Sequence, residues 1–150
     1  MKQKICLATD HAGFELKEHV KSFLESNGYE TKDFGADSYD KEDDYPDFII
    51  PCAKEVSKSK CLGIIFGGSG QGEAISSNKV KGIRAAVYYG FNLEIVKLSK
   101  LHNNANILSI GARFVSKDDA VESVKLWLAT KFHDESRHVR RISKILEFEK

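Results

Sequence analysis

Apolar residues recur along the chain with two alternating periods. Short apolar runs of strand length, such as residues 4–9 and 62–66, alternate with segments whose apolar residues recur at helical spacing. The segment after the first run carries Leu16, Val20, Phe23 and Leu24 on one helical face. Strands that alternate with helices are typical of a parallel sheet with crossover helices. The pattern therefore predicts an α/β fold: a three-layer, Rossmann-like, parallel five-stranded sheet with helices on both faces.

The strands are expected at residues 4–9, 29–33, 62–66, 84–89 and 107–110, with helices between them. Ser116 and Asp119 form a capping box that opens the helix after the fifth strand. Pro51 is expected near the start of its helix, because proline further inside removes a hydrogen bond. In the last helix, residues 134–148, the residues expected to face inward are Val139, Ile142 and Leu146.

Composition narrows the class of protein. With 150 residues and 41% hydrophobic content, the chain suits one core, so we expect a single domain over residues 1–150. A net charge of +1 does not favour nucleic acid or an anionic membrane as a partner, which leaves a small molecule.

Three cysteines without a C-x-x-C pair suggest a reducing compartment, where they act as packing residues. No signal peptide or membrane span is recognisable, and a cytoplasmic location is expected.

Side chains that could bind a ligand or take part in a reaction lie near the ends of the expected strands. Asp10 and His11 follow the first strand, residues 67–72 follow the third, and residues 111–113 follow the fifth. His102 and Asn103 lie just before the fifth strand. Because open α/β sheets bind ligands beyond the carboxyl ends of their strands, we expect these residues to meet at one edge.

Residues 67–72 read Gly-Gly-Ser-Gly-Gln-Gly and are the strongest local signal. Successive small residues let backbone N–H groups turn inward at a helix start, which favours an oxyanion or a phosphate. Neither the Walker pattern nor the dinucleotide fingerprint is present. A tight strand-to-helix turn without function is the alternative.

Glu73 closes this loop and is the candidate base. An aldose-ketose isomerase moves a proton between neighbouring carbons, which needs one carboxylate flanked by donors for the enediolate oxygen. Glu73, with Ser69 and the loop amides, offers that set. A helix cap without catalytic role is the plainer explanation.

Arg137 and Arg141 lie four residues apart on the last helix, so their guanidinium groups share a face that suits a phosphate. His138 and Arg140 add positive charge nearby. A solvated basic helix surface is the alternative, and a lone His102 is often structural. The acidic loop at residues 40–44 lacks calcium-loop spacing and is interpreted as a solvated turn, and no metal is expected.

The chain resembles the type B ribose-5-phosphate isomerases over nearly its whole length. Seven motifs carry the resemblance: Thr9-Asp10-His11-Ala12-Gly13, Asp44-Tyr45-Pro46, Gly67-Gly68-Ser69-Gly70-Gln71-Gly72-Glu73, Asn78-Lys79, Gly82-Ile83-Arg84, His102-Asn103-Asn104 and Arg137-His138-Val139-Arg140-Arg141. The resemblance implies an enediolate mechanism without a metal or other cofactor. It also implies a homodimer or homotetramer whose active site is shared between subunits, with the final helix crossing the interface.

The resemblance further implies a role for each site residue. Glu73 would be the base, with Asp10 and His102 assisting ring opening and Asn103 holding sugar hydroxyls. The loop residues Gly68, Ser69, Gly70, Gln71 and Gly72 would bind the enediolate. The phosphate would be held by Arg113, Arg137, Arg141, His11 and His138. One branch of the family uses a cysteine base at the position of Gly67, and this chain resembles the branch with glutamate.

Two other functions stay open. Galactose-6-phosphate isomerase and other 6-phosphohexose isomerases are similar in fold and chemistry, and differ in pocket length. A non-catalytic phosphosugar-binding module is compatible with the fold, but would not need a base.

Overall fold

The computed structural model describes residues 2–150, whose five strands form one parallel sheet in the order β2-β1-β3-β5-β4. The strands are β1 (Ile5–Thr9), β2 (Thr31–Asp33), β3 (Leu62–Gly67), β4 (Ala85–Tyr88) and β5 (Ile107–Gly111). The prediction of a five-stranded parallel sheet is confirmed. All strand ends agree with the sequence pattern to within two residues.

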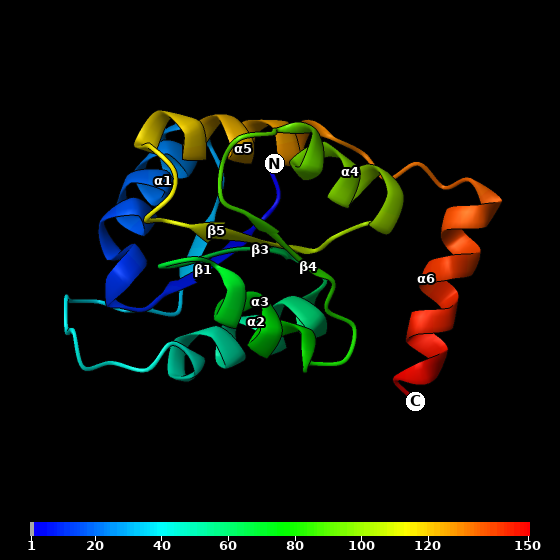
Figure 1. Ribbon diagram of the computed structural model, residues 1–150, viewed down its shortest axis with the longest axis horizontal. Helices are drawn as coiled ribbons and strands as arrows, with labels where there is room; N and C mark the ends of the chain where they lie inside the picture. The colour runs from blue at the N-terminus through cyan, green and yellow to red at the C-terminus, as the bar shows by residue number, and fades with distance from the viewer. Residues whose placement is uncertain (1) are drawn as a thin grey trace.

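Helices cover both faces of the sheet. They are η1 (a 3-10 turn, His11–Gly13), α1 (Phe14–Ser26), α2 (Pro46–Ser59), α3 (Gln71–Asn78), α4 (Glu94–Asn103), α5 (Lys117–Ala129) and α6 (Ser136–Phe148). Helices α1, α4 and α5 lie on one face and α2 and α3 on the other, which confirms the three layers (Figure 1). No helix in residues 2–150 has the length and apolar content to cross a membrane.

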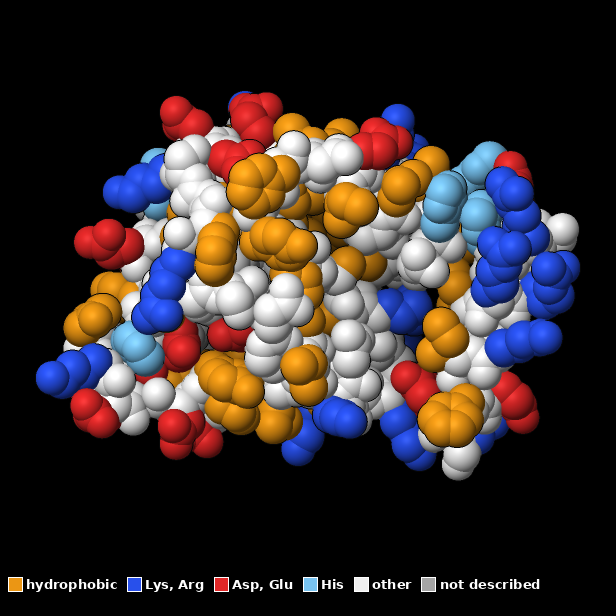
Figure 2. Space-filling model, viewed as in Figure 1, with side chains coloured by type: hydrophobic (Ala, Val, Ile, Leu, Met, Phe, Trp, Pro, Cys, Tyr) orange, Lys and Arg blue, Asp and Glu red, His pale blue; other side chains and the backbone are white. Residues whose placement is uncertain are grey.

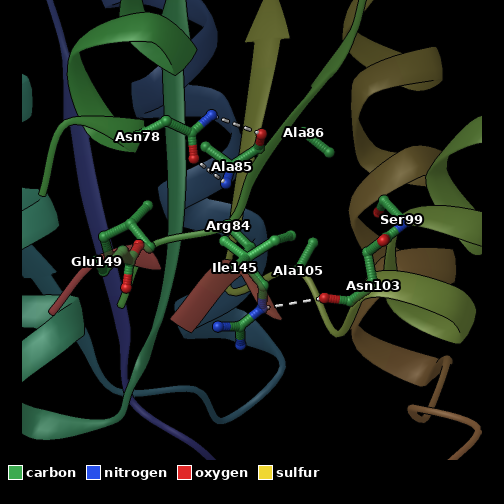
Figure 3. Close-up of a pocket in the computed structure, with 10 residues that line it drawn as sticks. Asn78, Arg84, Ala85, Ala86, Ser99, Asn103, Ala105, Ile145 and Glu149 are labelled. Atoms are coloured by element: carbon green, nitrogen blue, oxygen red, sulfur yellow. Dashed lines mark hydrogen bonds between the residues drawn. The ribbon is translucent and has the colours of Figure 1, made fainter. Parts of the chain in front are cut away.

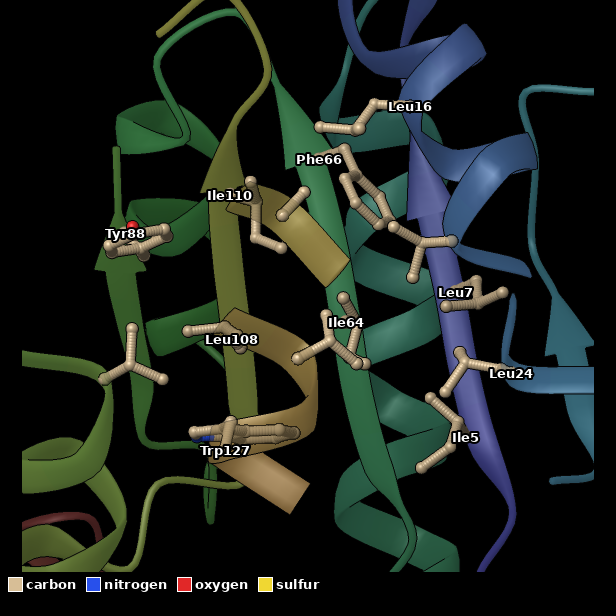
Figure 4. Close-up of a cluster of buried hydrophobic side chains, with 14 of the residues drawn as sticks. Ile5, Leu7, Leu16, Leu24, Ile64, Phe66, Tyr88, Leu108, Ile110 and Trp127 are labelled. Atoms are coloured by element: carbon tan, nitrogen blue, oxygen red, sulfur yellow. The ribbon is translucent and has the colours of Figure 1, made fainter. Parts of the chain in front are cut away.

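The core lies in two clusters, one on each side of the sheet. Trp127 on α5 is fully buried against the side chains of the central strands (Figure 4). The opposite cluster contains Cys6, Cys52 and Cys61, all buried, which confirms that the cysteines are packing residues. Because successive strand residues face opposite sides, an all-buried strand such as β1 supplies both clusters. The carboxyl ends of the strands are thereby fixed in a rigid frame.

Pro51 lies deeper in its helix than expected. Helix α2 begins at Pro46, and Pro51 is its sixth residue, so the expectation that Pro51 stands near the start is wrong. The side chain of Pro51 is exposed, where water can bond to the carbonyl that loses its helical partner. The start of α2 is instead marked by Pro46, a position where the missing N–H costs nothing.

Helix α6 differs most from the sequence expectation. Only Ile142, 8% exposed, is buried as predicted, whereas Val139 and Leu146 are 43% and 39% exposed. The helix stands beside the end of the sheet, near α4, rather than lying on a face (Figure 1). An apolar strip of α6, formed by Val139, Ile145 and Leu146, therefore has little cover within the described chain.

Candidate active site

The predicted site residues fall into two groups at opposite edges of the sheet. Asp10, Glu73 and Arg113 come after the carboxyl ends of β1, β3 and β5. His102 and Asn103 end α4, which leads into the amino end of β5. The expectation that all of them meet at one edge is wrong within a single chain, because residues before and after a parallel strand lie at its opposite ends. In Figure 1, α4 leads into one end of β5, and the connection to α5 leaves the other end.

The loop between β3 and α3 is fixed through its carbonyl groups. The Gly67 carbonyl accepts a hydrogen bond from the N–H of Ala112 at 2.8 Å, and that of Gly68 from Arg113 at 3.1 Å. In a trans peptide the C=O and the following N–H point in opposite directions. The N–H groups of Gly68 and Ser69 are therefore directed away from β5, as an oxyanion-binding loop requires.

Two of the loop glycines are required by close packing. Gly70 has φ of +79°, and its carbonyl accepts a 2.7 Å hydrogen bond from the Ser109 hydroxyl. A Cβ at Gly72 would lie 2.6 Å from the Tyr45 hydroxyl oxygen. Tight-turn geometry thus explains these glycines by itself. The orientation of the amides, rather than the glycine count, is the feature that points to a ligand.

Glu73 lies in the first turn of α3 and is 4% exposed. Burial raises the pKa of its carboxyl group, and the negative charge of Asp10 raises it further. A carboxylate of raised pKa is a stronger base than an ordinary glutamate. The environment of Glu73 is therefore suited to proton abstraction rather than to a solvated helix cap.

The Glu73 carboxylate occupies the space above Gly67. A Cβ added at position 67 would overlap that carboxylate. A side chain at position 67 and the carboxylate of Glu73 thus cannot occupy this space at the same time. A functional group attached at position 67 and one attached at position 73 would therefore reach the same point.

Asp43 is a site residue that the sequence interpretation missed. Its Oδ1 lies 2.6 Å from Nδ1 of His11 and accepts a second hydrogen bond from the His11 backbone N–H at 3.1 Å. The Asp43 side chain is 8% exposed, so the interpretation of its loop as a solvated turn is wrong for this residue. The only feature of the sequence that could have indicated Asp43 is its position in the loop after β2, at the carboxyl edge of the sheet.

Asp10, His11 and Asp43 are the one group among residues 2–150 whose ligand atoms lie close enough to hold a metal, within 4.8 Å of one another. The Asp43 and His11 atoms, however, are 2.6 Å apart, which is a direct hydrogen bond. Two ligands of one ion, each bound at about 2.0–2.2 Å in a tetrahedral site, lie further apart than that. The geometry fits a hydrogen-bonded pair better than a metal centre.

The second group of residues lies where α4 meets α6. The rings of His102 and His138 stack with centroids 4.5 Å apart and an interplanar angle of 15°. Burial lowers the pKa of His138, as do the charges of His102 and Arg137. Arg137 forms an ion pair with Glu135, with Nε and Oε2 2.9 Å apart, while Arg141 is exposed. Figure 2 shows basic side chains and histidines gathered along this end of the molecule.

Arg84 fixes the end of α4 at a cavity of about 390 Å³ between α6 and the sheet (Figure 3). Its guanidinium group donates to the carbonyls of Asn103 and Asn104 at 3.0 and 2.9 Å. Ile145 of α6 and Glu149, the residue directly after α6, line the other side of the cavity. The position of His102 and Asn103 is therefore set by Arg84 rather than by the glycine loop.

The carboxyl edge has the parts of an α/β enzyme that acts on a small anionic molecule. It combines the buried carboxylate of Glu73 with a loop whose amides are directed away from β5. His11 and Arg113 lie there too and could bind a negatively charged group. The family described as Ribose/Galactose Isomerase matches residues 5–145, and the chain belongs to this family.

Individual relatives are similar to this chain over more than nine tenths of their length. Ribose-5-phosphate isomerase B of Mycolicibacterium paratuberculosis is 41% identical, over 98% of this chain and 92% of the relative. The solved ribose-5-phosphate isomerase B of Clostridium thermocellum is 42% identical with a TM-score of 0.91, covering 97% of both chains. That of Mycoplasma genitalium, solved with bound ribulose-5-phosphate, is 36% identical with a TM-score of 0.93, covering 99% of this chain and 97% of that one.

Proposed function

We propose that this chain interconverts D-ribose 5-phosphate and D-ribulose 5-phosphate through an enediolate, as a single cytoplasmic domain of residues 1–150. The buried Glu73 carboxylate beside a loop of directed amides is the observation that carries this proposal. Membership of the family supports it, since relatives similar over their full length are named ribose-5-phosphate isomerase B.

In the proposed reaction, the open-chain aldose presents its C2 proton to Glu73. The carboxylate takes that proton, and the electron pair of the C–H bond forms the C1–C2 double bond of the enediolate. Backbone N–H groups of residues 68–72 and the Ser69 hydroxyl hold the negative oxygen. Glu73 then returns the proton to C1, while the proton of the C2 hydroxyl passes to the C1 oxygen, so that the C2 carbonyl of the ketose forms. No cofactor is required. Asp10 and His102 assist ring opening, and Asn103 binds sugar hydroxyls.

The phosphate group binds between two chains in this proposal. His11 and Arg113 lie with Glu73 at the carboxyl edge, whereas Arg137, His138 and Arg141 lie at the far end of the same chain. One chain cannot bring both groups to one substrate. A homodimer, or a tetramer built from such dimers, joins the carboxyl edge of one chain to α6 of the other. The exposed apolar strip on α6 supports this arrangement, because a second copy would bury it.

Turnover measured side by side on ribose 5-phosphate and galactose 6-phosphate tests the function. We expect turnover on the pentose to exceed that on the hexose, with solvent deuterium incorporated during isomerisation. Preference for the hexose would assign the chain to the other activity of the family. Absence of turnover and of deuterium exchange on both substrates would indicate a binding module.

Glu73→Gln tests the base within that assay. It keeps the shape of the side chain and should lower turnover by about 100- to 10,000-fold while leaving substrate binding nearly intact. Glu94→Gln is the matched control, since Glu94 also lies in the first turn of a helix but is exposed. If Glu73→Gln keeps more than a tenth of wild-type turnover, Glu73 is a helix cap.

A further inference from the structure

Asp43 is a buried carboxylate that the proposed reaction does not use. It lies in the loop between β2 and α2, and its side chain is 8% exposed. Its Oδ2 is buried without a hydrogen-bond partner among the described residues. Most buried polar atoms in proteins have a hydrogen-bond partner, so the unpaired Oδ2 distinguishes Asp43 from an ordinary structural carboxylate.

The contacts of Asp43 fix one imidazole ring. Asp43 Oδ1 accepts hydrogen bonds from both the backbone N–H and Nδ1 of His11, at 3.1 and 2.6 Å. Tyr39 packs edge-on against the same ring, with centroids 5.9 Å apart. With Nδ1 bound to Asp43, the remaining ring nitrogen, Nε2, lies on the opposite side of the ring and is free to donate to a ligand.

We propose that Asp43 is a positioning residue that holds His11 in the orientation in which its Nε2–H donates to the substrate's phosphate. The proposal rests on the proposed function, in which His11 binds that phosphate. Asp43 itself does not touch the substrate. It acts as the carboxylate partners of many functional histidines do, by fixing the tautomer and the angle of the ring.

The charges around His11 give this contact a pH dependence. The hydrogen bond that His11 donates to Asp43 is the largest cause of a raised His11 pKa. Burial opposes this rise, the charge of Asp10 adds to it, and the charge of Arg113 lowers the pKa. A raised pKa keeps the ring protonated where an ordinary histidine, with a pKa of about 6.5, is already neutral. As the pH rises through the raised pKa, His11 loses its charge and phosphate binding should weaken.

Two substitutions separate orientation from charge. Asp43→Asn keeps a hydrogen-bond acceptor but removes the negative charge, so the pKa of His11 should fall. The increase in KM that accompanies deprotonation of His11 should then begin at a lower pH than in the wild type. Asp43→Ala removes both, and should raise KM for ribose 5-phosphate by roughly 10- to 100-fold at about pH 7.5, while kcat changes by less than about threefold. Asp40→Asn, an exposed aspartate of the same loop, is the matched control.

Steady-state kinetics across pH, with inorganic phosphate as a competitive inhibitor, provide the test. NMR titration of the His11 ring checks its pKa directly in the wild type and in Asp43→Asn. The proposal is overturned if Asp43→Asn and Asp43→Ala both show the wild-type KM, phosphate inhibition and His11 titration. If the wild type itself does not turn over ribose 5-phosphate, the proposed function fails. Phosphate binding and the His11 titration then still decide the role of Asp43.

Discussion

Replacing Gly67 by alanine tests whether Glu73 acts from the position it occupies in the structure. A Cβ at position 67 would overlap the Glu73 carboxylate, and its three nearest atoms all belong to that group. The φ of Gly67 is not positive, so alanine fits the strand backbone. The substitution should therefore displace the carboxylate and leave the sheet intact.

The expected loss of activity follows from that overlap. Relief of the clash requires the carboxylate to move by more than about 1 Å, and a misplacement of that size costs on the order of 100-fold in rate. Gly67→Ala should thus lower kcat by about 100-fold or more, toward the level of Glu73→Ala. The double variant should be no worse than Glu73→Ala alone, because both changes remove the same group.

A coupled assay of ribulose 5-phosphate formation measures these rates, and thermal unfolding confirms that each variant folds. Gly67→Cys in the Glu73→Ala background extends the test, since its thiol would stand where the carboxylate stood. We expect it to recover part of the activity, rising with pH toward the usual thiol pKa of about 8.5. A Gly67→Ala variant that keeps more than half of the wild-type kcat would refute the placement of the base.

Three further predictions concern the stability of the fold and the role of His102. Lys17 is fully buried and donates to both Asp33 oxygens at 2.8 Å, so Lys17→Met should lower the free energy of unfolding by about 3–5 kcal/mol. Lys21→Met, which removes a partly exposed partner of the same carboxylate, should cost less than about 1 kcal/mol in the same urea titration. Glu73→Gln should increase stability near neutral pH, because the raised pKa means that ionised Glu73 destabilises the folded state. That gain should vanish as the pH falls below the ordinary value of 4.5. His102→Ala should slow conversion of ribose 5-phosphate more than deuterium exchange on open-chain ribulose 5-phosphate; equal losses would assign His102 to the proton transfer.

The fold could be predicted because its signals are local. Alternating apolar runs and helical periods mark β1, β3 and the helices between them, and the Ser116 hydroxyl accepts from the N–H of Asp119 as the capping pattern predicts. Burial on both faces makes such strands continuously apolar, which separates them from the helices. These features depend on residues a few positions apart.

The parts that sequence reasoning missed depend on long-range geometry. Nothing in the acidic loop distinguishes Asp43 from Asp40, because the pairing of Asp43 with His11 depends on how the loop folds back to η1, after the carboxyl end of β1. An amphipathic pattern shows that α6 has an apolar face, but not whether the same chain or another covers it. The edge at which His102 lies follows from its place before β5, because residues that precede a parallel strand lie at its amino end.

Mixing two inactive variants tests most directly whether the two groups of residues form one active site between chains. A Glu73→Gln chain and an Arg141→Ala chain are refolded together, with subunit exchange confirmed by mass or tag capture. In a mixed dimer, one site carries both substitutions and the other carries neither. Random pairing makes about half of the dimers mixed, so activity should recover to about a quarter of the wild-type value. A mixture that exchanges subunits yet stays as inactive as the separate variants would contradict the shared site.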